Sequence, residues 1–454
     1  MLRPSLLFAL GVSTLATLTP NPSSAADVIR EVRSARSGSA PAAYRDGEVI
    51  VQFRDRMDRG VRDSLVREAG GDFSRESPDR VTVLVRLAPG ISVDEGIRRF
   101  SGMREVAFAE RNGILRKSGG DTFVPNDKFY SFQWNLKMLN AERTWGIQKG
   151  KSSVAVAVID TGIAYENRGP YRKAPDFDGT TFLPGYDFVN GDPYPNDDDG
   201  HGTHVASTIA ESTNNGLGVA GLAFNCALMP IKALDQNGDG SYFDIAQAID
   251  YATNYSENGT NPVKVINMSL GGGPDDFSET VKRAIDAAVA KGILVVVAAG
   301  NDDGPVTFPG NLASALAVGA VDARKERASY SNFGKELDLL APGGNCDRDD
   351  DNDGYGDCVY QQTLDPIGLR AGRYDLFCYC GFDGTSMATP HVAAAAALLY
   401  AQGITDAAAV RAALEQTADP LSGNQGVRTD TMGFGLIQPA VALSGLGLNQ
   451  GSLK

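Results

Sequence analysis

The residues of this chain that could do chemistry gather in a few short motifs. Only three histidines occur in its 454 residues, and two of them, His201 and His204, share the segment Gly-His-Gly-Thr-His-Val at 200–205. The third, His391, stands five positions after Ser386 in a Gly-Thr-Ser-Met-Ala-Thr-Pro-His motif. A serine hydroxyl becomes a good nucleophile only when a neighbouring base takes its proton, and imidazole suits that work near neutral pH. The motifs therefore favour a serine activated by a histidine.

Polar residues also follow three apolar runs directly. Asp160 begins Asp-Thr-Gly-Ile after one run, Ser269 begins Ser-Leu-Gly-Gly after a second, and Asn301 ends Ala-Ala-Gly-Asn at the end of a third. A single polar residue just past a strand is most often a turn former. Three of them at one edge of a sheet favour a site instead. A carboxylate such as Asp160 could fix the tautomer of an imidazole and stabilise its charged form.

The elements that must position these residues alternate between strand and helix. The expected strands are mostly apolar, as is typical of strands covered on both faces, and lie at 154–159, 228–234, 263–268, 293–298 and 315–321. The expected helices lie at 203–211, 243–255, 279–291, 387–401 and 406–416. Thr405 stands where the last helix needs an N-cap, and Gly292 where the third helix needs a stop. This alternation predicts an α/β fold, a doubly wound, mainly parallel sheet with helices on both faces, whose ligands bind at the carboxyl ends of the strands.

The N-terminal part is organised differently. Residues 1–26 read as a secretory signal peptide, with a basic start, an apolar run too short to span a bilayer and a small-residue cleavage site; a membrane anchor is the alternative. A Ser/Ala/Arg-rich linker at 27–46 precedes a small α+β domain at 47–116. Its expected strands lie at 48–53, 81–87 and 106–110, and its helices at 61–69 and 93–100. The segment 117–124 then reads as an exposed linker suited to proteolytic cutting.

Charge separates these two parts of the chain. Residues 1–118 hold 19 of the 42 Lys and Arg but only 15 of the 56 Asp and Glu, so their net charge is +4 and that of the remainder −18. An acidic body argues against nucleic acid or an anionic membrane as the main partner and for solubility outside the cell. We expect the protein to be a monomer. Five cysteines in an exported chain predict one or two disulfides and one remaining thiol.

Three of the motifs are similar to the active-site motifs of the subtilisin-like serine proteases. These are Asp-Thr-Gly at 160–162, His-Gly-Thr-His at 201–204 and Gly-Thr-Ser-Met-Ala-Thr-Pro at 384–390. The resemblance covers 125–446, which would be the catalytic domain, and leaves a short tail at 447–454. The domain at 47–116 resembles the inhibitory propeptide of that family. The resemblance implies a secreted endopeptidase that acts on protein or peptide substrates and is made as a precursor inhibited by its own propeptide.

The resemblance also implies roles for single residues. Asp160, His201 and Ser386 would be the catalytic triad, and Asn301 would donate to the oxyanion from its side chain. His204 lies one helical turn beyond His201, so we interpret it, like His391, as a packing residue. The substrate would lie in extended form against small residues. These substrate-binding residues are Ser269, Leu270, Gly271, Gly272, Ala298, Ala299, Gly300 and Gly240.

An acidic insertion between 343 and 384 departs from the family pattern. It offers calcium-loop oxygens from the side chains of Asp349, Asp351, Asp353 and Asp357 and from the carbonyl of Tyr355. The twelfth position is tyrosine, not the usual glutamate. A structural Ca²⁺ site is therefore predicted, with an acidic solvated loop as the alternative. Two of the cysteines, at 346 and 358, bracket this loop.

Three other classes of function are alternatives to a serine protease. An esterase of the α/β-hydrolase type needs the order Ser, acid, His, but the only histidine after Ser386 stands five residues away on the same helix. A zinc peptidase would need a His-Glu-x-x-His motif, which the chain lacks. The serious rival is an exported calcium-binding or adhesion protein that keeps the scaffold without turnover. The complete set of Asp160, His201, Ser386 and Asn301 speaks against it.

Overall fold

The computed structural model describes residues 44–78, 80–113, 122–273, 275–350, 352–421 and 427–445. These residues form two compact units, of which one precedes and one follows the expected linker in the sequence. The expected signal peptide at 1–26 and the linker residues 117–121 lie outside the described residues. The domain boundaries therefore remain predictions, and each unit is described by itself.

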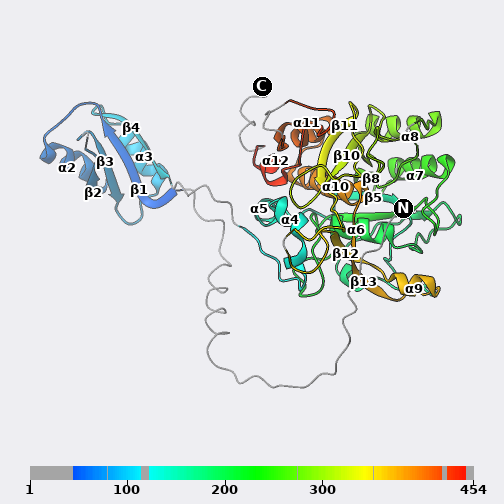
Figure 1. Ribbon diagram of the computed structural model, residues 1–454. Helices are drawn as coiled ribbons and strands as arrows, with labels where there is room; N and C mark the ends of the chain where they lie inside the picture. The colour runs from blue at the N-terminus through cyan, green and yellow to red at the C-terminus, as the bar shows by residue number, and fades with distance from the viewer. Residues whose placement is uncertain are drawn as a thin grey trace, which may run out of the picture. The chain divides into compact units, whose positions relative to one another are not determined.

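The N-terminal unit is an antiparallel sheet with two helices (Figure 1). Its strand order is β2-β3-β1-β4, from β1 Tyr44–Phe53, β2 Gly71–Glu76, β3 Thr82–Leu87 and β4 Val106–Gly113. Helices α2 Arg59–Glu68 and α3 Val93–Ser101 pack on the sheet around a core that includes Val51, Val85 and Phe100. The expected α+β domain is confirmed, but sequence reasoning missed β2.

The C-terminal unit is built on a seven-stranded sheet in which every neighbouring pair of strands is parallel. The order is β11 Leu337–Pro342, β10 Leu316–Val321, β9 Leu294–Ala298, β8 Val263–Met268, β5 Ala155–Asp160, β7 Ala227–Lys232 and β6 Tyr186–Asp187. All residues of β5, β7, β9, β10 and β11 are buried. This explains their apolar sequences, since both faces of the sheet are covered.

Helices cover the sheet on both faces (Figure 1). One core contains buried residues of α6 His201–Ala210 and α10 Thr385–Gln402. The other contains those of α7 Tyr242–Asn254 and α8 Glu279–Ala290. The remaining helices are α4 Trp134–Met138, α5 Ala141–Ile147, α9 Pro366–Arg370, α11 Ala407–Thr417 and α12 Pro439–Gly445, and two short 3₁₀ turns lie at Tyr130–Phe132 and Pro175–Phe177. The doubly wound, parallel architecture expected from the sequence is confirmed.

A separate antiparallel hairpin lies within the acidic insertion. Its strands are β12 Val359–Leu364 and β13 Phe377–Phe382, and β13 leads directly into the start of α10. Disulfides join Cys346 to Cys358 and Cys378 to Cys380, while Cys226 is a buried free thiol. Sequence reasoning did not foresee this hairpin.

Two helix starts differ from expectation in ways that matter for the site. Helix α6 begins at His201 rather than at 203, and α10 begins at Thr385, so Ser386 is its second residue. The expected N-cap Thr405 is wrong, because the carboxylate of Asp406 accepts the N–H of Ala409 instead. Gly292 follows the end of α8 with a positive φ of 80°, as expected of a helix stop.

None of the described helices is by itself long and apolar enough to cross a membrane. The bent pair α10 and α11 passes this test of length and composition only when the two are taken together. Nearly all of α10 is buried inside the protein.

Candidate active site

Asp160 and His201 meet where β5 ends and α6 begins. The Nδ1–H of His201 donates to Oδ1 of Asp160 at 2.7 Å, and the N–H of Thr161 donates to the same oxygen at 2.8 Å. Close approach of the helix depends on Gly202, because a Cβ there would lie 2.1 Å from the carbonyl oxygen of Gly162. The bond from Nδ1 fixes the tautomer and leaves Nε2 to accept a proton.

Buried carboxylates dominate the electrostatics of His201. Its side chain is nearly buried, and burial alone lowers the pKa of an imidazole. The charge of Asp160 and the hydrogen bond to it, with further help from Asp199 and Asp197, outweigh burial and raise the pKa of His201 above its usual value. The arrangement therefore stabilises the imidazolium that would form when His201 takes a proton.

Ser386 is held against the carboxyl end of β8. Its Oγ donates to the carbonyl of Ser269 at 3.1 Å, and the Ser269 hydroxyl donates back to the carbonyl of Ser386 at 2.9 Å. The Ser386 side chain is half-buried, so it is accessible to a ligand. Its hydroxyl must leave the Ser269 carbonyl before its proton can pass to His201.

Asn301, just past the end of β9, lies beside the start of α10. Its Oδ1 accepts the backbone N–H of Thr385 at 2.8 Å and the Thr385 hydroxyl at 2.9 Å. These two bonds leave Nδ2 of Asn301 free to face Gly384. A Cβ placed on Gly384 would lie 3.5 Å from this nitrogen. The N–H of Ser386 is in the first turn of the helix and has no carbonyl partner within the helix. Two donors are thus available to a developing oxyanion.

The other two histidines are packed into the protein. Nε2 of His204 donates to the carbonyls of Val359 and Cys380 at 3.0 and 3.2 Å, and its ring stacks on Phe382. His391 donates from Nδ1 to the carbonyl of Met387 and accepts the amide of Asn135 at Nε2. Burial lowers the pKa of His204 to about 3 and that of His391 to about 4. Both rings are therefore neutral in the folded protein.

Comparison with known protein families identifies the family to which this chain belongs. The family model of the subtilase family matches residues 151–435. The chain belongs to the subtilase family. A second model, the fervidolysin N-terminal prodomain, matches residues 30–112. The protein is thus a subtilisin-like serine protease preceded by a prodomain.

Individual relatives agree with this assignment. A thermophilic serine proteinase of Bacillus sp. strain AK1 is 36% identical over 84% of this chain and 84% of its own length. Thermitase of Thermoactinomyces vulgaris is 34% identical over 66% of this chain and 94% of its own. A solved protease structure from Pseudoalteromonas arctica matches with a TM-score of 0.61 and 32% identity. The match covers 71% of this chain and 99% of the solved chain.

In this subtilase, a cleft of ≈ 420 Å³ opens beside His201. Four of the expected substrate-binding residues line it, namely Ser269, Leu270, Gly271 and Gly240. Gly272, Ala298, Ala299 and Gly300 do not line this cleft. The side chains of Ala298 and Ala299 are buried, and Gly300 donates its N–H to the Thr385 hydroxyl. Sequence reasoning missed Leu234, Tyr242 and Phe308, which supply apolar walls from segments far apart in the chain.

The acidic loop is held largely by its own backbone. The carboxylate of Asp349 accepts the N–H groups of Asp353 and Gly354, and that of Asp353 accepts the N–H of Tyr355. Asp357 accepts the N–H of Asp350, while Asp351 lies outside the described residues. Within the described ranges, no three His, Cys, Asp or Glu side chains converge closely enough to hold a metal ion. The calcium loop remains a prediction.

A second group of oxygens, missed from the sequence, lies around the loop at 214–219. Asp127 accepts the N–H of Asn214, and Asp176 accepts the Asn215 amide and the N–H of Val219. Burial raises the pKa of both carboxyls, that of Asp176 to about 6, and the charge of Asp127 adds to the second shift. Oδ1 of Asp127 is buried without a hydrogen-bond partner. Two crowded carboxylates with an orphaned oxygen fit a hard cation such as Ca²⁺.

Proposed function

We propose that the chain is a secreted serine endopeptidase that cleaves peptide bonds through an acyl-enzyme and is made as a self-inhibited precursor. The observation that carries this proposal is the short bond from Nδ1 of His201 to the buried Asp160. It fixes an imidazole that lines a cleft, at the same sheet edge as Ser386. Membership of a family of serine proteases supports the same conclusion.

The residues divide the reaction between them. Oγ of Ser386 attacks the peptide carbonyl while Nε2 of His201 takes its proton, and Asp160 stabilises the resulting imidazolium. The carbonyl oxygen becomes negatively charged and accepts hydrogen bonds from Nδ2 of Asn301 and the N–H of Ser386. His201 then gives the proton to the leaving amine, and the C–N bond breaks to leave an acyl ester. Water repeats the steps on this ester, with His201 as the base, and releases the acid and free Ser386.

The N-terminal unit is proposed to act as an intramolecular inhibitor. Support comes from the prodomain match at 30–112 and from the compact unit whose last described strand ends at Gly113. Cutting within 117–124 would release it, and export would follow removal of residues 1–26. The mature N-terminus found by sequencing of the secreted protein should therefore lie at or after about Lys117. The precursor of a Ser386→Ala variant should persist if the cut is autocatalytic.

Calcium is proposed as a structural ion of this enzyme. The residues proposed to hold it are Asp127 and Asp176 with the loop at 214–219, and the acidic loop residues Asp349, Asp351, Asp353, Tyr355 and Asp357. When bound, the ion would screen the mutual repulsion of these carboxylates and stabilise the fold. No step of peptide hydrolysis requires it.

Hydrolysis of casein by the purified mature protein tests the proposal. The wild type should release acid-soluble peptides, and the Ser386→Ala protein should not. A folded wild type that binds calcium but leaves casein intact would instead support the rival, an exported binding protein on a subtilase scaffold.

A further inference from the structure

The carboxylate of Asp160 has few contacts that fix its direction. Its Oδ1 accepts the N–H of Thr161 and the Nδ1–H of His201, whereas its Oδ2 is buried without a hydrogen-bond partner. The carboxylate is therefore aimed by the backbone of the turn that begins at Thr161. Residues that hold this turn decide how Asp160 meets His201.

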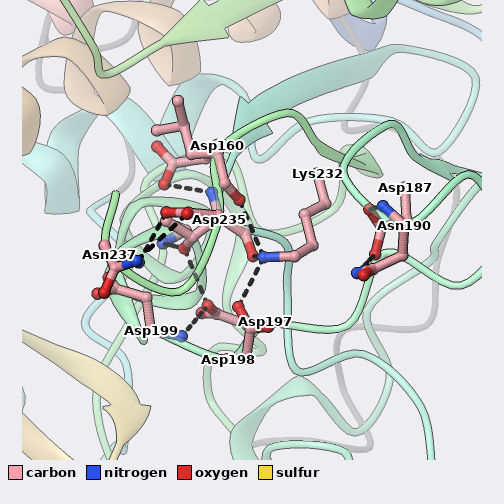
Figure 2. Close-up of polar contacts among 12 residues, drawn as sticks. Asp160, Asp187, Asn190, Asp197, Asp198, Asp199, Lys232, Asp235 and Asn237 are labelled. Atoms are coloured by element: carbon pink, nitrogen blue, oxygen red, sulfur yellow. Dashed lines mark hydrogen bonds and ion pairs between the residues drawn. The ribbon is translucent and has the colours of Figure 1, made fainter. Parts of the chain in front are cut away.

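Lys232 is placed to hold this turn. It is the last residue of β7 and lies directly opposite Asp160, the last residue of β5, in the register of the two parallel strands. Its side chain is 1% exposed. Nζ donates to the carbonyls of Thr161 and Leu234, each at 2.9 Å, and lies 2.6 Å from Oδ1 of Asp198 (Figure 2). An ammonium group has three N–H donors, so all three are used.

The three acceptors of Lys232 belong to separate segments that border the proposed active site. Thr161 lies in the turn after β5, and Asp198 lies in the turn before His201. Leu234 lines the cleft beside His201, whereas Lys232 itself does not line it. One buried cation therefore joins the turns on which the base and its carboxylate partner depend, without being part of the cleft wall.

Asp197 connects the same two turns through side-chain atoms. Its Oδ1 accepts the hydroxyl of Thr161, and its Oδ2 accepts the N–H and the hydroxyl of Thr203 in the first turn of α6. The Thr161 hydroxyl also accepts the N–H of Gly202. The side chain of Thr161 is thus fixed by Asp197 and its carbonyl by Lys232, so mutation can separate the two contributions.

Stability alone does not account for a buried lysine at this place. A buried ion pair adds little net stability relative to apolar side chains of similar size, because both charges lose their hydration. Lysine, however, donates to several chosen oxygens at once, which an apolar side chain cannot do. The contacts of Lys232 therefore favour a role in orientation.

Resting on the proposed peptidase function, we propose that Lys232 is a positioning residue of the triad, which holds the turns beside Asp160 and His201 so that the carboxylate and the imidazole meet. Proton transfer from Ser386 to His201 requires a narrow geometry, and a displacement of about 1 Å can cost about a hundredfold in rate. Substrate binding depends instead on the cleft, which Lys232 does not line. Loss of Lys232 should therefore lower kcat much more than it raises KM.

Steady-state hydrolysis of a peptide p-nitroanilide by matured Lys232→Met tests this inference. Methionine is similar to lysine in length and removes the donors and the charge. We expect kcat about a hundredfold below that of the wild type and KM within about threefold of it. Active sites are counted by titration with a fluorophosphonate, so misfolded molecules do not contribute. The value of kcat is read on the alkaline plateau of its pH profile, where His201 is neutral, so a changed pKa of His201 is not counted as lost position.

A second variant guards against a failure of Lys232→Met to fold. That change leaves the largely buried charge of Asp198 without its cation, which is destabilising. Lys232→Met combined with Asp198→Asn removes this charge, but the carbonyls of Thr161 and Leu234 still lack their donor. We expect the double variant to be more stable than Lys232→Met and to show the same loss of kcat.

Arg411→Met is the matched control. Arg411 also joins a backbone carbonyl to a carboxylate, because it donates to the carbonyl of Ala315 at 3.0 Å and to Oδ1 of Asp338 at 2.6 Å. These acceptors lie at the amino ends of β10 and β11, at the sheet edge opposite the proposed triad. Arg411→Met should lower the melting temperature but keep kcat within about threefold of the wild type.

An unchanged kcat per active site in Lys232→Met would overturn the inference, as would a raised KM with kcat unchanged. A kcat restored by adding Asp198→Asn would also overturn it, because the loss would then come from charge and not from position. So would an equal loss of kcat in Arg411→Met, which would show general destabilisation. A wild type that cleaves no peptide would refute the proposed function itself and this inference with it.

Discussion

The sheet edge that carries the proposed triad and the inserted segment at 345–382 are built in opposite ways. At the edge, short apolar strands end in a polar residue, as at Asp160, or are followed by one, as at Ser269, so local sequence patterns show where polar side chains emerge. In the insertion, β12 buries Gln361, Gln362 and Thr363. The comparison shows that chemistry at a strand end can be read locally, whereas a segment held by distant polar partners cannot.

The two regions are nevertheless connected through helix α6. Its first residue, His201, belongs to the site, and His204, one turn later, donates to both strands of the hairpin. Thr363 of the hairpin donates to the carbonyl of Gly200, directly before the helix. His201 is therefore proposed to contribute to the chemistry at the start of α6, and His204 contributes structural support one turn later.

The largest effect should be a loss of activity on changing the residues proposed to carry out the chemistry. His201→Ala and Ser386→Ala should each lower kcat on the order of 10⁶-fold, because nucleophile and base act as a unit. The melting temperature of Ser386→Ala, matured by added wild-type enzyme, should change little because this side chain does not anchor the insertion. A loss of less than about a hundredfold in kcat for His201→Ala would contradict its role as the base.

A change of His204, which supports the hairpin, should lower stability rather than activity. His204→Ala should lower the free energy of unfolding by about 3 kcal/mol, because it removes a donor shared by two buried carbonyls and a packed ring. The measurement is urea unfolding of enzyme inactivated by a sulfonyl fluoride. As a control, His204→Ala combined with Phe382→Ala should cost less than the sum of the single changes, since the rings stack. A stable His204→Ala protein without activity would reverse our choice of base.

Removal of calcium tests which of the two proposed sites, the acidic loop of the insertion or the site of Asp127 and Asp176, holds a stabilising ion. Chelation should lower the melting temperature, because binding to the native state at a hundredfold excess over Kd adds about 2.7 kcal/mol. We expect Asp127→Asn to remove more of this response than the pair Asp351→Ala and Asp353→Ala. Oδ1 of Asp127 is buried without a hydrogen-bond partner, whereas the carboxylates of Asp349 and Asp353 already accept backbone N–H groups. The reverse order would place the ion in the acidic loop. An unchanged wild-type melting temperature would exclude a stabilising calcium ion.

The smallest effect is a slope in the pH dependence of stability. The unfolded chain protonates His204 below about pH 6.5, whereas burial lowers the folded-state pKa to about 3. The folded state is therefore favoured fully above pH 6.5 and loses up to about 1.4 kcal/mol per pH unit below it. His204→Gln should remove this contribution in urea titrations between pH 7 and 5 and leave that of His391. A slope identical to that of the wild type would show that His204 titrates normally.

Particular residues show what the sequence could and could not predict. The sequence predicts β8 to the residue and the strand before Asp160 nearly so, because mainly apolar residues mark a strand covered on both faces. Strand β2 was missed because only its first residue is buried and its sequence, Gly-Asp-Phe-Ser-Arg-Glu, is mainly polar. Asp127 and Asp176 were missed because the fold alone brings these distant residues to one loop.

The hairpin of β12 and β13 was missed for the same reason, since its buried polar residues pair with residues far away in the sequence. Nε2 of Gln362 donates to Glu211, and its Oε1 accepts the N–H of Asp176. Buried polar residues of this kind carry no hydrophobic period, so the chain gives no local signal that they form a strand.

The central claim, that Asp160 and His201 activate Ser386, is tested most directly by covalent labelling. Matured wild type treated with a fluorophosphonate at pH 8 should gain one adduct, which mass spectrometry of peptides should place on Ser386. His201→Ala should label far more slowly, His204→Ala should label at nearly the wild-type rate per folded molecule, and Ser386→Ala should not label. A label on another residue, or one that persists in Ser386→Ala, would contradict the account.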